Sequence, residues 1–148
     1  MSASWKVLHL ACACLLLGNV IVSGVWALFA ERTRNHAIIQ FSNRMVLWTD
    51  FFFTLLGALG LVITGTTMAS DFGGHVNHPW MQWAYALLSL SGLIWLLVLV
   101  PIQIKQRSLL RNSQEVCAQY WRLSRWWQGA GALATLLLLP IIYLMVTK

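Results

Sequence analysis

Charged residues are scarce in this chain. Asp and Glu number four, and all charged residues together make up 9% of its 148 residues, whereas an ordinary soluble domain has about 25%. Acid and base catalysis needs several positioned ionisable groups, and the sequence has neither a phosphate-binding glycine loop nor a Ser-His-Asp arrangement in one place. This composition excludes an ordinary soluble domain and argues against soluble enzyme chemistry.

Cysteine and proline are scarce as well, with three residues each. Cys12 and Cys14 are two residues apart on a predicted helix and therefore lie on different faces, and Cys117 falls in a predicted loop. No structural disulfide is expected. Pro101 and Pro140 are expected to kink or end their helices, because proline removes a backbone donor.

Long apolar runs dominate the sequence, of which 59% is hydrophobic. Four of these runs approach the roughly 20 residues that a helix needs to cross a bilayer, and a continuous apolar run satisfies its backbone groups in lipid only as a helix. The sequence therefore predicts an all-α fold, a single domain of residues 1–148 that forms a four-transmembrane-helix bundle. The predicted helices span about residues 7–30, 46–69, 81–104 and 127–146.

The basic residues predict the orientation of this bundle. Residues 70–80, between the second and third runs, contain no Lys or Arg, whereas the first and third connections contain most of the ten in the chain. The positive-inside rule then places both termini on the outer, periplasmic side of a bacterial inner membrane. The net charge is +6, and its basic residues lie beside the ends of the predicted helices. This distribution indicates contact with membrane lipid and no nucleic-acid partner. The basic residues of the two connections are Arg32, Arg34, Arg44, Lys105, Arg107, Arg111, Arg122 and Arg125.

His9 is the one histidine inside a predicted membrane helix, and an ionisable side chain at that depth is a functional hypothesis by default. The predicted orientation brings further histidines, methionines and a tyrosine to the same outer face. Imidazole and thioether groups suit Cu(I) and also serve as axial ligands of haem iron, although methionine is also a common filler of apolar helices. The predicted cofactor-binding residues are His9, Met68, His75, His78, Met81, Tyr85 and Met145.

The leading interpretation is binding of haem b, or a related redox cofactor, through His9 for electron transfer or oxidation. The chain would then be a component of a haem-dependent oxidoreductase. A haem held by two transmembrane histidines is not expected, so the second ligand would be a methionine or a loop histidine, or else water or nothing. The alternatives are copper binding or transport by His9, His75 and His78, and a cofactor-free accessory role in a homo-oligomer or a larger membrane complex.

A second polar feature lies at the start of the second apolar run, where Asp50 follows Trp48 and Thr49. Acidic groups within a membrane usually pair with basic ones, so a structural ion pair between Asp50 and Arg44 is predicted. A proton relay would need more carboxylates than the chain provides.

Several motifs together resemble a known family. They are Trp5-Lys6-x-Leu8-His9, the glycine pattern from Gly57 to Gly65, Trp80 before the third apolar run, and Tyr120-x-Arg122-Leu123-x-Arg125. The chain resembles small bacterial predicted integral membrane proteins of unknown function and, more distantly, is similar to HemJ-type protoporphyrinogen oxidases and CopD-type copper resistance membrane proteins. The distant likeness implies a haem-binding or copper-handling bundle in which His9 is central. HemJ-type proteins carry a lysine early in the third helix, and residues 80–85 here contain none.

Overall fold

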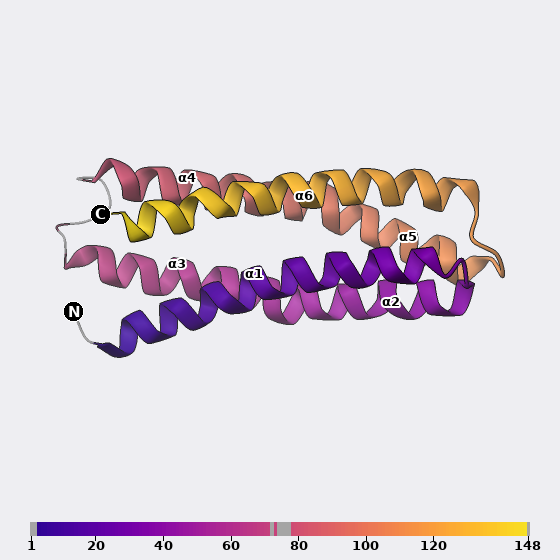
Figure 1. Ribbon diagram of the computed structural model, residues 1–148, viewed down its shortest axis with the longest axis horizontal. Helices are drawn as coiled ribbons and strands as arrows, with labels where there is room; N and C mark the ends of the chain where they lie inside the picture. The colour runs from indigo at the N-terminus through magenta and orange to yellow at the C-terminus, as the bar shows by residue number, and fades with distance from the viewer. Residues whose placement is uncertain (1–2, 72, 74–77, 148) are drawn as a thin grey trace.

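The computed structural model describes residues 3–71, 73 and 78–147, which form four long helical spans (Figure 1). All four are long and apolar enough to cross a membrane, so the predicted all-α fold with four transmembrane helices is confirmed. Two of the spans are interrupted by a short π-helical turn. In chain order the elements are α1 (Ala3–Arg32), α2 (His36–Thr49), η1 (Asp50–Thr54), α3 (Leu55–Ser70), α4 (Pro79–Ile94), η3 (Trp95–Leu99), α5 (Val100–Asn112) and α6 (Ala118–Val146).

Each span is longer than the apolar run that predicted it. The second begins at His36, ten residues earlier than expected, and its start is capped by Asn35, whose side chain accepts from the backbone N–H groups of Ala37 and Ile38. The apolar run marks only the part of a helix that lies in lipid, and the polar turns at its end were therefore taken for loop. As a result Arg44 lies within α2, and Arg107 lies within α5.

The bundle has two distinct halves along its long axis. The terminal half consists of residues 3–18, 55–70, 79–94 and 132–147, and both ends of the described chain lie at its outer edge (Figure 1). The loop half consists of residues 19–54 and 95–131, and it carries the α1–α2 and α5–α6 connections at the opposite end. The two π-helical turns, η1 and η3, lie where the halves meet.

Small residues hold the helices of the terminal half in two pairs, α1 with α3 and α4 with α6. A Cβ atom added to Gly57 of α3 would lie 3.1 Å from the Leu16 Cβ of α1, and one added to Gly60 would collide with the Cys12 sulfur. Ser91 of α4 donates to the Ala134 carbonyl of α6 at 2.9 Å. Close backbone approach of this kind is what drives helix association in lipid.

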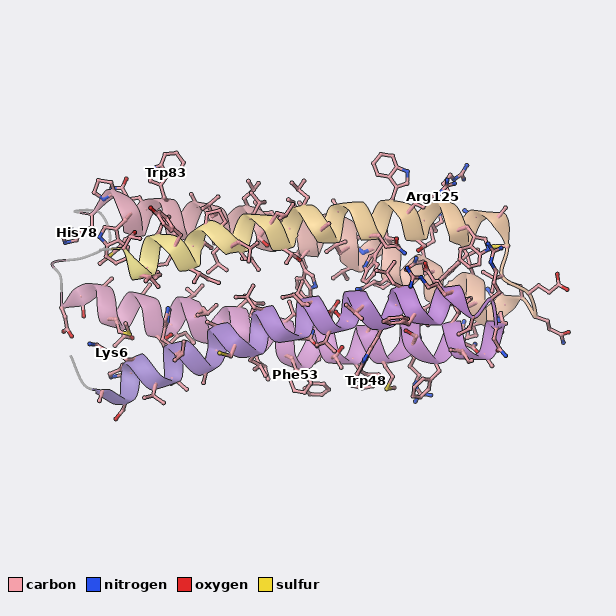
Figure 2. All side chains as sticks on the ribbon, viewed as in Figure 1. Lys6, Trp48, Phe53, His78, Trp83 and Arg125 are labelled. Carbon is pink, nitrogen blue, oxygen red and sulfur yellow. The ribbon has the colours of Figure 1, made fainter. Side chains whose placement is uncertain are left out.

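The loop half contains a compact hydrophobic cluster, formed by Ile39, Leu110 and Tyr120 from α2, α5 and α6. Many large apolar side chains elsewhere point away from the bundle, as Phe53 and Trp83 do in Figure 2. Outward-facing apolar side chains suit a protein whose solvent is lipid, because lipid tails are as apolar as the side chains themselves.

Candidate functional site

A large cavity opens in the terminal half between the α1–α3 pair and the α4–α6 pair. Its volume is about 510 Å³, within the range of about 300–1,000 Å³ that is usual for small-molecule sites. Most of its wall is aliphatic, and the ionisable side chains among its described lining residues are Lys6, His9 and Tyr85. An apolar chamber with a few polar groups is the usual form of a site for an organic ligand.

His9 is held on the wall of this cavity by Thr64 of α3, whose Oγ1 lies 2.7 Å from His9 Nδ1. The Thr64 hydroxyl already donates to the Gly60 carbonyl at 2.6 Å, so its oxygen is the acceptor and His9 Nδ1 is the donor. In the neutral ring the lone pair then resides on Nε2. A histidine that binds a metal usually has this arrangement, in which the other ring nitrogen donates to a fixed acceptor.

The cavity also gathers most of the other residues predicted for the site. His9, Met68, Met81, Tyr85 and Met145 all line it, and they come from all four helical spans. The Tyr85 hydroxyl and His9 Cε1 each lie 3.5 Å from the position that a Cβ on Gly65 would occupy. The structure therefore brings these five residues around one chamber, and whether they bind a cofactor stays a prediction.

Of the two other predicted histidines, His78 is not among the described residues that line the cavity. His78 precedes Pro79 at the start of α4, and its ring lies 6.3 Å from the Trp80 ring, centroid to centroid. It lies at the same end of the bundle as Lys6 (Figure 2). His75 falls outside the described residues. Among those that are described, no three His, Cys, Asp or Glu side chains converge as a metal site would require, so the metal ligand set stays a prediction.

The structure gives Asp50 hydrogen-bond partners other than Arg44, with which an ion pair was predicted. Asp50 is buried in the middle of the second span, whereas Arg44 is exposed and six residues away, on another face of the helix. Its carboxylate instead accepts from neutral groups of three helices: Asn19 Nδ2 at 3.0 Å and Thr54 Oγ1 at 3.2 Å on one oxygen, and Gln103 Nε2 at 2.7 Å on the other. These bonds join α1, η1 and α5 at the boundary between the two halves.

A second carboxylate, Glu31, was not identified from the sequence. Its oxygens accept from Tyr120 at 3.1 Å, from Ser124, and from Gln128 Nε2 at 2.7 Å. The three donors are four residues apart on α6, so they form a polar stripe along one side of that helix. That spacing was readable in the sequence, but the predicted start of the helix at residue 127 left Tyr120 and Ser124 outside it.

Comparison with known families identifies one match, and it extends over residues 4–148, almost the whole chain. The chain belongs to the family described as "Predicted integral membrane protein (DUF2269)". Neither a curated protein nor a solved structure matches it. Membership of DUF2269 agrees with the four apolar spans and confirms the predicted membrane-protein family, whereas the more distant similarity to HemJ-type and CopD-type proteins stays a prediction.

Proposed function

We propose that this DUF2269 protein binds haem b, or a related redox cofactor, in the terminal-half cavity through His9, and that it serves electron transfer or oxidation. The observation that carries the proposal is the His9–Thr64 contact. Thr64 donates to Gly60 and accepts from His9 Nδ1, which orients the imidazole on the cavity wall and keeps the lone pair on Nε2. Such a nitrogen is suited to ligate iron.

The remaining wall suits the other parts of a haem. Aliphatic side chains from four helical spans offer an apolar surface to a flat macrocycle, and Lys6 supplies a positive charge for acidic substituents. Met68, Met81 and Met145 offer thioethers that would serve as a second ligand. A bound haem would supply a one-electron redox centre, and this chain would supply the His9 imidazole, the apolar walls and the exclusion of water.

The experiment is an absorption spectrum of the full chain, purified after expression with a haem supply. We expect a Soret band that is lost in His9→Ala and retained in His36→Ala. His36 is a matched control, because its Nε2 bonds the Leu110 carbonyl at 3.0 Å in the loop half, away from the cavity. A protein without a Soret band, or a band unchanged in His9→Ala, would overturn the proposal.

Copper binding is the second candidate, favoured by three thioethers and one imidazole around the same cavity. These are the soft and borderline ligands that Cu(I) takes. Metal analysis distinguishes it from haem: stoichiometric copper without a Soret band, lost in His9→Ala and in the His75→Ala, His78→Ala double variant, supports copper. A stable co-purifying partner, with neither chromophore nor metal, would instead support a cofactor-free accessory subunit.

We also propose that the chain lies in a bacterial inner membrane with both termini on the outer side. Arg32, Arg111 and Arg122 lie near the loop-half end of the bundle, and basic residues favour the cytoplasmic side. A C-terminal alkaline phosphatase fusion should be active and a C-terminal green fluorescent protein fusion dark. The opposite pair of results would reverse the orientation without affecting the cofactor proposal.

A further inference from the structure

A second and much smaller cavity lies in the loop half, where α2, α5, α6 and the end of α1 meet. Its volume is about 20 Å³. Four residues on its wall have a buried polar atom without a hydrogen-bond partner among the described residues: Ser42 Oγ, Asn43 Oδ1, Gln103 Oε1 and Trp127 Nε1. Gln103 is 1% exposed. Because an unpaired buried polar group is destabilising, four such groups around one cavity indicate a common partner.

The chemistry of the four atoms selects that partner. The amide oxygens of Asn43 and Gln103 only accept, the Trp127 indole only donates, and the Ser42 hydroxyl does either. A metal cation cannot accept the indole N–H, whereas a water molecule both donates and accepts. The cavity also exceeds the volume of about 10–15 Å³ that one water needs, and a buried water takes two to four polar partners.

We propose that the loop-half cavity is a binding site for one ordered water molecule. The water donates to Gln103 Oε1 and Asn43 Oδ1 and accepts from the Trp127 indole and the Ser42 hydroxyl, so it joins α2, α5 and α6. Gln103 also donates to Asp50 through Nε2 at 2.7 Å, and Glu31 lines the same cavity. The water thereby extends the Asp50 hydrogen-bond network from mid-membrane toward the Glu31 network.

Solid-state NMR of the full chain in lipid bilayers tests this site, with ¹⁵N in the tryptophan indoles and polarisation transferred from water protons. The Trp127 resonance is identified by its loss in Trp127→Phe. We expect transfer to this indole in the unaltered chain. Gln103→Met removes an acceptor while keeping the side-chain length, and it should abolish the transfer.

Two further variants keep the test decisive. If Gln103→Met fails to fold, Ser42→Val fills the cavity without touching the Asp50 contact, and it should abolish the same transfer. Gln40→Met makes the same amide-to-thioether change at a residue that does not line the cavity and bonds the Leu110 carbonyl, so the transfer should persist. The proposal is overturned if the unaltered chain shows no transfer, or if the transfer survives both cavity variants. It is also overturned if the transfer requires sodium in the buffer, because the cavity would then depend on a cation.

Discussion

The two halves of this bundle are formed by the same four helical spans and yet pack in opposite ways. The terminal half separates into two helix pairs around a cavity of about 510 Å³, whereas the cavity where α2, α5 and α6 meet in the loop half is about 20 Å³. In the loop half and at its boundary, Asp50 and Glu31 bind polar side chains from neighbouring helices. In lipid, hydrogen bonds and close packing hold helices together. The helices therefore pack closely where polar contacts join them, and they leave a cavity where such contacts are scarce.

The largest effect on stability is expected from removing the Asp50 carboxylate at the boundary between the two halves. Asp50→Leu leaves the buried Gln103 amide and Thr54 hydroxyl without their acceptor and removes one of the two acceptors of Asn19, and each unpaired buried group costs about 1–3 kcal/mol. We expect the free energy of unfolding, measured in bilayers by steric trapping, to fall by about 3 kcal/mol. Glu115→Leu is the control, because Glu115 is exposed in the α5–α6 connection. Equal stability of the two variants would mean that Asp50 does not hold the halves together.

The contrast in free volume can be tested with one substitution at two sites. Ala30 lines the small cavity and Ala84 lines the large one, and both are buried. Ala30→Leu overpacks the loop half and should lower the free energy of unfolding by about 2 kcal/mol. Ala84→Leu should cost less than about 1 kcal/mol, because the cavity receives the added atoms, and it should weaken cofactor binding. Similar unfolding free energies for the two variants would remove the contrast.

A smaller effect on stability is expected from adding a Cβ atom where α1 and α3 approach closely. A Cβ on Gly57 would lie 3.1 Å from the Leu16 backbone nitrogen and 3.2 Å from the Cys12 carbonyl oxygen, neither of which can move independently of α1. Gly57→Ala should therefore destabilise by about 1 kcal/mol. Gly18→Ala, at a site with no atom within 4 Å, should be neutral or slightly stabilising. Thermal or detergent unfolding of both variants checks the order.

The smallest effect on stability is expected at the cavity wall. Thr64→Val keeps the shape of the side chain but removes the acceptor of His9 Nδ1, at a cost of about 0.6 kcal/mol for one interhelical bond. Affinity for the cofactor should nevertheless fall by about 10–100-fold, the usual cost of losing a partner that orients a ligand histidine. Thr66→Val is the control, because Thr66 is exposed and bonds only carbonyls of its own helix. Titration of cofactor into both variants measures the difference, and equal affinities would mean that Thr64 does not orient His9 for binding.

The fold was largely predictable because each span contains an apolar run long enough to cross a membrane. The gathering of His9, Met68 and Met145 was also predictable, since alternating helix directions fix which ends share a depth. The hydrogen-bond partners of the polar side chains within the spans were not predictable. Asp50 was given a basic partner from general experience with buried acids, but the structure uses Gln103, a residue 53 positions later.

The rotation of each helix about its own axis explains why these hydrogen-bond partners could not be predicted. Which side of a helix faces its neighbour depends on rotation about the helix axis, and an apolar sequence records rotation poorly when every face is hydrophobic. For this reason Thr64 was not predicted as the partner of His9, nor Gln103 as that of Asp50, because nothing in their local sequence identifies the neighbour that each side chain faces.

The π-helical turns have a consequence for changes in chain length. A π-helical turn contains one residue more than the α-helical turn it replaces, and one residue corresponds to a rotation of about 100°. Deleting one residue from Phe51–Phe53 would therefore restore a regular helix and keep α3 in nearly its present rotation relative to α2, whereas deleting one between Leu55 and Ile63 would turn Thr64 by about 100°. After the second deletion Thr64 would no longer face His9, although the remaining side chains would be unchanged. The site therefore depends on how many residues separate Leu55 from Thr64, a property that no substitution can probe.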